Sequence, residues 1–141
     1  MPSYITAEIF AAAVGKLVDL PKVNKIAVAV SGGADSMALC LLAAQFAKNN
    51  HQELLALIVD HKLRQESSIE AKKVQTWLQK RHINTEILCW SGDKPHTKVQ
   101  EVARAARYAL LLKRCKKSKI KYLFVAHHLD DQAETMMFRL S

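Results

Sequence analysis

The sequence predicts an α/β fold in which a parallel sheet lies between two layers of helices. Four short segments rich in apolar and β-branched residues alternate with longer segments of helical periodicity. The segment at 54–59 is apolar throughout, as expected of a strand that is covered on both faces. A turn with two adjacent glycines joins the first strand to a helix, which is a common arrangement at the ligand-binding edge of such sheets.

Each element is predicted from its own residue pattern. An amphipathic helix over residues 5–18 places Ile5, Ile9, Ala13 and Leu17 on one stripe, and Pro21 ends it. Strands are predicted at 25–30, 54–59, 85–90 and 122–126. Helices are predicted at 36–48, 67–82 and 97–117, and again after residue 130, where Asp130 or Asp131 provides an N-cap.

Two of the predicted helices carry further signals. Ser67 and Glu70 have the spacing of a capping box, and the helix that they open has Val74, Trp77 and Leu78 at its core positions. The helix over 97–117 is expected to turn a set of small and apolar residues toward the sheet, namely Val99, Val102, Ala103, Ala106 and Leu110. Right-handed crossovers and a reversal of strand order then bring the carboxyl ends of the strands to one crevice.

Length and composition limit the classes of protein. At 141 residues the chain is expected to form one domain, 1–141, with a full core. Half of its residues are hydrophobic, but no apolar run approaches the roughly 18 residues that span a bilayer, and the first residues lack the pattern of a secretory signal. Cys40, Cys89 and Cys115 form no C-x-x-C pair, which argues against a zinc site, disulfides or a dithiol and fits a reducing cytoplasm.

The charge balance of the chain is basic. Lys and Arg number 21 against 13 Asp and Glu, which gives a net charge of +8 and suits a polyanionic partner such as RNA. The densest basic run lies between Lys113 and Lys121. It is either a solvated helix end or a contact for nucleic acid.

The glycine-rich turn, Ser31–Ser36, has the composition of an anion-binding site. Adjacent glycines let the backbone take a positive φ and approach a ligand closely. N–H groups of the turn and of the following helix then converge on a negative group, and Ser31 and Ser36 add hydroxyl donors. No Lys follows the glycines, as a Walker loop requires, and the three spaced glycines of a dinucleotide fingerprint are missing. We therefore expect phosphate binding; the alternative is an ordinary turn whose Gly and Ser cap the helix.

Polar residues that follow the other strands add candidates. The segment Asp60–Arg64 combines an acid, an imidazole and a guanidinium, which suits a nucleotide, although a polar loop would look the same. On a helix starting near residue 130, His127 would share a face with Asp131, and Asp130 with Glu134. Such carboxylates beside a phosphate site suit Mg²⁺, and a histidine there can move a proton; an N-cap is the alternative.

Two arginines occupy one face of the helix over 97–117. Arg104 and Arg107 lie three residues apart and are therefore neighbours on the helix surface. They are either solvated or bidentate ligands of phosphate.

Four motifs taken together resemble one family. The Ser31–Ser36 segment resembles the SGGxDS loop of the N-type ATP pyrophosphatases, the PP-loop superfamily. Three further stretches are similar to its tRNA(Ile)-lysidine synthetase branch, and they are Val59–Arg64, Ala103–Tyr108 and His127–Thr135. The resemblance covers roughly residues 24 to 141. It implies an adenine-nucleotide α-hydrolase-like, Rossmann-like fold whose loop after the first strand grips the pyrophosphate of ATP.

The resemblance also implies a function. Enzymes of this family adenylate the wobble cytidine of an isoleucine tRNA with a CAU anticodon, and free lysine then displaces AMP through its ε-amine to give lysidine. ATP and Mg²⁺ are the implied cofactors. The implied nucleotide-binding residues are Ser31, Gly32, Gly33, Ala34, Asp35, Ser36, Asp60, His61 and Arg64. Asp35 and Asp131 are candidates near Mg²⁺, and the catalytic candidates are His127, Asp131 and Arg107, with Arg104 in reserve for Arg107.

Two departures from the family pattern affect these expectations. Lys62 stands where the family usually has Gly, and the chain stops at Ser141, before the family's fifth strand and tRNA-binding domains. The chain is therefore expected to be an N-terminal ATP-binding fragment, truncated after the fourth strand and the following helix, which binds ATP without modifying tRNA. The alternatives are another PP-loop ligase or tRNA thiolase, and a nucleotide-binding module without catalysis. Thiolases usually carry catalytic or cluster-binding cysteines, which this chain lacks.

Overall fold

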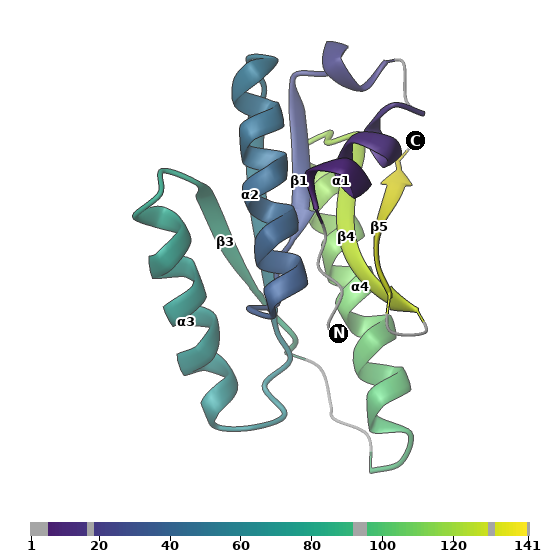
Figure 1. Ribbon diagram of the computed structural model, residues 1–141. Helices are drawn as coiled ribbons and strands as arrows, with labels where there is room; N and C mark the ends of the chain where they lie inside the picture. Colours follow the sequence, from purple (N-terminus) through teal and green to yellow (C-terminus); the bar gives the residue numbers. More distant parts are fainter. Residues whose placement is uncertain (1–5, 17–18, 92–95, 130–131, 141) are drawn as a thin grey trace.

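The computed structural model describes residues 6–16, 19–91, 96–129 and 132–140, which form one five-stranded sheet with helices on both faces (Figure 1). The strand order is β3-β2-β1-β4-β5. The strands are β1 (Lys25–Ala29), β2 (Glu53–Asp60), β3 (Asn84–Cys89), β4 (Tyr122–Leu129) and β5 (Gln132–Arg139). The helices are α1 (Ala7–Val14), α2 (Ala34–Asn49), α3 (Glu66–Gln79), α4 (Val99–Lys117) and the short 3₁₀ helix η1 (Leu20–Lys22). Strands β1 to β4 are parallel, and β5 is antiparallel to β4.

The handedness of the crossovers decides which helices cover which face. The chain steps from β1 to β2 to β3 in one direction and then returns across the sheet to β4, on the other side of β1. Right-handed crossovers in opposite directions require opposite faces. Residues of α2 and α3 accordingly pack in one core cluster, and residues of α4 pack in the other. The predicted three-layer α/β class is confirmed, with its switch point between β1 and β4.

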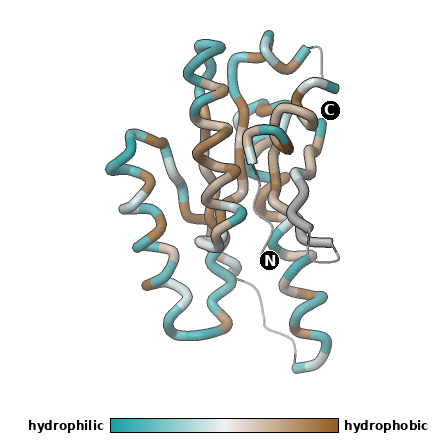
Figure 2. Tube along the Cα trace, viewed as in Figure 1, coloured by the Kyte–Doolittle hydropathy of each residue, from teal (hydrophilic) through white to brown (hydrophobic). Residues whose placement is uncertain are grey.

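Alternate residues of β1 supply the two cores. Ile26 and Val28 point to the cluster that contains Leu39 and Leu78, whereas Ala27 points to the cluster with Leu111. All six side chains are fully buried. Burial of each leucine contributes about 2 kcal/mol to the stability of the fold. Figure 2 shows the hydrophobic residues gathered along the central strands, while the helices near the edges carry many hydrophilic ones.

The first helix is shorter than the predicted range 5–18. Helix α1 begins after Thr6, whose Oγ1 accepts a hydrogen bond from the Ile9 N–H at 3.2 Å. Phe10 is its buried anchor, with its ring centroid 5.6 Å from that of Phe124. The sequence periodicity predicts Ala13, and not Phe10, on the buried stripe of this helix. The periodicity carries no information about Phe124 of β4, which packs against Phe10.

The predicted capping box at α3 is wrong. Ser67 Oγ lies 2.7 Å from Asp60 Oδ1 and 2.9 Å from the Arg64 carbonyl oxygen, and it donates to these acceptors instead of capping the helix. Glu70 forms an ion pair with Arg64. The N-cap of α3 is Gln65, which makes no side-chain cap. The local pattern predicts that the Ser67 hydroxyl caps the helix, but this hydroxyl donates to the buried carboxylate of Asp60 at the end of the preceding strand.

The predicted inward face of α4 is wrong at Val102, whereas the other four residues predicted there are partly buried. Val102 is 39% exposed, and the buried residues of this helix are Leu111 and Cys115. Figure 1 shows the first turns of α4 extending beyond the ends of the strands.

The predicted helix after residue 130 is also wrong. Strand β5 pairs along its length with β4, and Met137 packs on one core cluster while Met136 and Phe138 pack on the other. This period of two suits a strand, and the pairing covers the edge of β4. His127 lies in β4 opposite Glu134 of β5, so the helical pairs predicted for this segment do not form. The proposed N-cap residues, 130–131, lie outside the described residues.

A membrane-crossing helix is not found in the part of the chain that the structure describes, because each helix there is too short or too polar.

Asp19 ties the chain before β1 to the far edge of the sheet. Its carboxylate accepts hydrogen bonds from the Tyr122 hydroxyl and, at 3.0 Å, from Lys121 Nζ, and Arg139 lies 3.5 Å away. The hydrogen bonds from Tyr122 and Lys121 are the main causes that lower the pKa of Asp19 to about 2. Folding therefore favours the carboxylate form of Asp19 over its protonated form.

We expect Asp19→Asn to flatten the acid end of the stability profile. A carboxyl with a pKa of about 2 when folded, and about 3.9 when unfolded, contributes stability that is complete above the unfolded value and is lost as the pH falls toward 2. The free energy of unfolding, measured with denaturant at a series of acidic pH values, should fall more steeply for the wild type than for Asp19→Asn. Glu53→Gln, which removes a carboxylate from an exposed ion pair, controls for lost negative charge. Equal slopes for wild type and Asp19→Asn would contradict this assignment.

Candidate functional site

The turn between β1 and α2 is shaped by its own serines. Ser36 is buried, and its Oγ accepts the Ser31 N–H at 3.0 Å and donates to the Gly33 carbonyl oxygen at 3.2 Å. The two hydroxyl oxygens are 3.0 Å apart. Gly33 is the N-cap of α2, and no side chain caps that helix. The serines therefore stabilise the turn and do not cap the helix, and a helix start without a side-chain cap suits an anion.

The two glycines of the turn have different constraints. Gly32 has a φ of +89°, and a Cβ added there would lie 3.0 Å from Val74 Cγ2 on α3. Gly33 has a φ of −73°, and a Cβ there would meet only Ser31 Oγ at 3.6 Å. Gly32 is thus required by the backbone and by helix packing, whereas Gly33 leaves open space above the turn.

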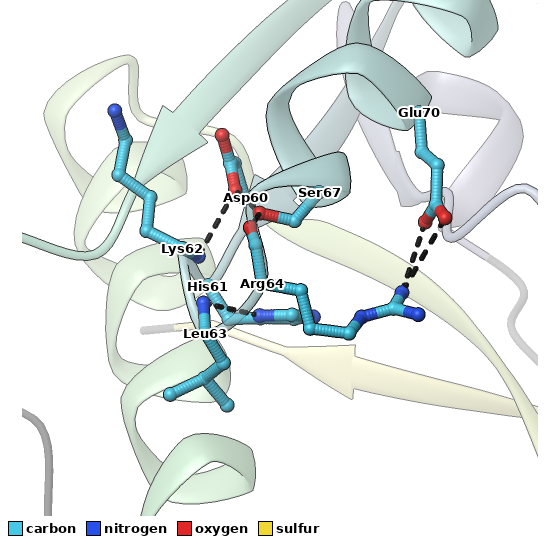
Figure 3. A network of polar contacts seen from close by, with 7 residues as sticks. All are labelled: Asp60, His61, Lys62, Leu63, Arg64, Ser67 and Glu70. Carbon is cyan, nitrogen blue, oxygen red and sulfur yellow. Dashed lines mark hydrogen bonds and ion pairs between the residues drawn. The ribbon is translucent and has the colours of Figure 1, made fainter.

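Asp60 at the end of β2 organises the loop that follows (Figure 3). Its Oδ1 accepts hydrogen bonds from the Lys62 N–H at 3.0 Å and from Ser67 Oγ, and its Oδ2 accepts one from Ser68 Oγ at 2.6 Å. Burial acts to raise the pKa of Asp60, but the hydrogen bonds and the nearby Lys62 charge outweigh it and lower the pKa. Both carboxylate oxygens are used within the protein, so Asp60 positions the loop.

Lys62 adopts the left-handed conformation, with a φ of +55°. This backbone region favours glycine, and a lysine there costs about 1 kcal/mol. The N–H of Lys62 is held by the Asp60 carboxylate two residues earlier, which is the hydrogen bond of an Asx-turn. The loop therefore keeps a glycine-compatible shape although Lys occupies the position.

His61 and Arg64 extend from the same loop (Figure 3). His61 Nδ1 accepts the Leu63 N–H at 3.0 Å, so in the neutral imidazole the proton is on Nε2, which is a hydrogen-bond donor. Arg64 Nη2 lies 3.1 Å from Glu70 Oε2, with both side chains about 60% exposed. An ion pair so exposed contributes little to stability, and an anionic ligand can compete for the arginine.

Two adjoining cavities lie at the carboxyl ends of β1, β2 and β4. The smaller, about 290 Å³, is bounded by the turn after β1, the loop after β2 and the inner face of α3. The larger, about 480 Å³, lies toward α4 and includes Gln100, Arg104 and Tyr108. His61 and Arg107 line both cavities. Residues from three separate sequence motifs are thus brought together at the predicted edge of the sheet.

Arg107 is the most strongly desolvated cation of this site. Burial lowers the pKa of its guanidinium, and the charge of Arg104 acts in the same direction. Neither arginine has a carboxylate partner among the residues that the structure describes, and both lie within 6 Å of the Tyr108 ring, at 5.7 and 5.9 Å. A partly buried guanidinium without a counter-charge is costly, so the arrangement favours an anionic ligand.

Three further residues were predicted for the site, and the structure describes them in less detail. Asp35 lies in the first turn of α2, next to the glycine turn, and is partly buried. The backbone of His127 belongs to β4, and Asp131 lies outside the described residues. No group of three or more His, Cys, Asp or Glu that could hold a metal ion occurs in the described ranges. Gln100 and Tyr108 were not predicted as cavity residues; their helical spacing from the two arginines was the available signal.

Comparisons with known proteins identify the family of the chain. The profile of the PP-loop domain family matches residues 6–141. The tRNA(Ile)-lysidine synthase of Wolbachia pipientis wMel is 46% identical over 119 residues, which are 83% of this chain and 28% of that protein. The enzyme of the same name from Rhodopseudomonas palustris is 45% identical over 118 residues, which are 82% of this chain and 34% of that protein. The chain thus spans no more than about a third of the length of these curated relatives.

A solved structure shares the fold. The U34-tRNA thiolase NcsA from Methanococcus maripaludis, determined with its [4Fe-4S] cluster, superposes with a TM-score of 0.76 at 21% identity. The match covers 89% of this chain and 45% of the thiolase. At this identity the similarity concerns the fold.

We expect Gly32→Ala to destabilise the fold more than Gly33→Ala. Alanine at position 32 must hold a positive φ and displace Val74, at a cost of about 1–2 kcal/mol, whereas alanine at position 33 meets an ordinary contact. Denaturant unfolding of both variants measures the difference, with Gly33→Ala as the matched control. Equal stabilities would show that the turn relaxes without cost.

Proposed function

Because the chain belongs to the PP-loop domain family, we propose that it is the ATP-binding, adenylating domain of a tRNA(Ile)-lysidine synthase. One observation carries the proposal: Ser31 of the turn after β1, His61 and Arg107 line adjoining cavities at one edge of the sheet, and Arg107 has no carboxylate partner among the described residues. The two bacterial relatives of that name support the choice within the family. A cytoplasmic location follows from a tRNA substrate.

The proposed reaction has two steps. The C2 oxygen of the wobble cytidine, in a tRNA(Ile) with a CAU anticodon, attacks the α-phosphorus of ATP. The bond to the β-phosphate breaks, so pyrophosphate leaves and the cytidine is adenylated at O2. The ε-amine of free lysine then attacks C2, AMP departs with the oxygen, and the amine loses a proton to give lysidine.

The chain's own residues supply binding and charge stabilisation in this reaction. Backbone N–H groups at the start of α2 and the Ser31 hydroxyl would hold the phosphates, as at other helix starts. Arg107, with Arg64 released from Glu70, would neutralise the negative charge that grows on the transferring phosphate. The Nε2–H of His61 would donate to the nucleotide, and His127 would take the proton of the amine.

Mg²⁺ suits a site that combines a carboxylate with the phosphates of a bound nucleotide. It binds through one or two carboxylates together with phosphate oxygens of the substrate and water, so it does not need a cage of three protein ligands. We propose Asp35, beside the phosphate-binding turn, and Asp131 as the carboxylates that would hold it. The ion would supply positive charge to the phosphates when bound.

The thiolase alternative is less well supported by the cysteines of these 141 residues. Cys40 and Cys115 are buried in core clusters on opposite faces of the sheet. Burial raises the pKa of the Cys40 thiol to about 12 and that of the Cys115 thiol to about 11. Cys89 is exposed at the end of β3. These three thiols cannot share one metal cluster, and the two buried ones are poor nucleophiles.

We expect calorimetric titration with ATP and Mg²⁺ to detect binding to the wild-type chain and a loss of at least about tenfold in affinity in two variants. Arg107→Gln removes a charge-assisted contact, typically worth about 1.5–3 kcal/mol, and Gly33→Val fills the space above the N–H groups of the turn. Arg139→Gln removes the same charge at a distant edge and should bind ATP as the wild type does. Normal affinity in both site variants would contradict the phosphate site. ATP affinity that is kept in Arg107→Gln but lost in Gly33→Val would limit the phosphate site to the glycine turn.

A further inference from the structure

The outer face of α3 carries a row of basic and apolar side chains that the proposed ATP site does not use. The row, here termed the α3 stripe, consists of Ile69, Lys72, Lys73, Thr76, Trp77 and Lys80. Their helical spacing of i, i+3, i+4, i+7, i+8 and i+11 places them on one face. Together with Ser68 they line an open hollow of about 610 Å³.

The α3 stripe concentrates positive charge around exposed apolar surface. Lys72, Lys73 and Lys80 are exposed, and none of them has an ion-pair partner in the part of the chain that the structure describes. Arg81 follows directly, with its guanidinium carbon 3.4 Å from the centroid of the Trp77 ring. Ile69 is 59% exposed. Trp77 is partly buried and packs against the core beneath the helix, as the sequence predicts. A helix face that only contacts water nevertheless has no need of an exposed isoleucine among four cations.

The α3 stripe is close to the site in space. The inner face of the same helix contributes Ser67, Ala71 and Val74 to the smaller cavity. An α-helix with its side chains is about 10 Å across, so a molecule seated on the stripe lies roughly one helix width from that cavity. Figure 1 shows α3 at the edge of the molecule, beside β3, with its outer side away from the sheet.

We propose that the α3 stripe docks the phosphate backbone of the RNA whose base reacts in the adjoining site. Lysine ammonium groups bind phosphates as point charges, and the distance along the helix from Lys72 to Lys80, about 12 Å, lets the row contact successive phosphates. A second copy of the chain would bring four cations against four cations. A lipid surface would find only Ile69 and Trp77 as apolar contacts. This inference rests on the proposed function for its RNA substrate, but its own residues lie outside the ATP site.

The test is a charge-neutralising variant with a matched control. Lys72→Gln, Lys73→Gln and Lys80→Gln are combined in one variant, because Gln keeps helix propensity. The control combines Lys113→Gln, Lys116→Gln and Lys117→Gln, which removes three exposed lysines from the carboxyl end of α4, on the opposite face of the sheet. Binding of a stem-loop RNA with a CAU loop to the 141-residue chain is measured from about 50 to 200 mM salt.

We expect the stripe variant to lose at least about tenfold in RNA affinity at low salt and about 2–3 in the slope of log K against log salt. The control should lose no more than about threefold. In a Trp90→Phe background, Trp77 fluorescence should change when RNA binds. Equal RNA affinity in the wild type and the stripe variant would overturn the proposal. It would equally fail if the stripe lysines governed binding to anionic vesicles, or self-association, instead of RNA binding.

ATP titration of the same proteins separates this inference from the proposed function. The stripe variant should bind ATP as the wild type does, because none of its lysines lines the ATP cavities. A wild-type chain that binds ATP but not RNA overturns the docking surface and leaves the nucleotide site standing. RNA binding that depends on the stripe lysines, in a chain that does not bind ATP, supports the docking surface and contradicts the proposed function.

Discussion

The return from β3 to β4 is the constraint on which the site depends. A right-handed crossover in that direction puts α4 on the face opposite α2 and α3, and it places the switch point between β1 and β4. The glycine turn after β1 and the arginines in the first turns of α4 therefore reach the same edge from opposite faces. Arg107 can line both cavities because it stands where the two layers of helices face each other across the ends of the strands.

The buried carboxylate of Asp60 adds local order to this topology. It holds the Lys62 N–H and the hydroxyls of Ser67 and Ser68, so it joins the end of β2 to the first turn of α3. Breaking one of these hydrogen bonds would leave the buried charge of Asp60 with fewer donors, which costs free energy. The network therefore holds the loop and the start of α3 in one arrangement. The loop with His61 and Arg64 and the start of α3 are positioned by this one carboxylate.

What the sequence could predict was local, and what it missed was set by distant partners. The four parallel strands, the glycine turn and the gathering of polar residues at the strand ends follow from short-range patterns and from crossover handedness. Strand β5 was predicted as a helix because its pairing with β4 is not visible in helical spacing. Ser67 was assigned to a cap because the competing acceptor, Asp60, lies seven residues earlier. Only the φ of +89° and the neighbouring Val74 distinguish Gly32 from Gly33.

The charge distribution links the site to the α3 stripe more directly than the net charge of +8 does. Several carboxylates are committed to partners elsewhere, and these are Asp19 with Lys121 and Tyr122, Asp60 with two serines, Glu70 with Arg64 and Glu86 with Arg114. Arg107 and the stripe lysines are left without such partners in the described ranges. Repulsion among unpartnered cations opposes folding, and a polyanion that contacts both groups relieves it. An RNA bound as proposed would neutralise the α3 stripe and the site together.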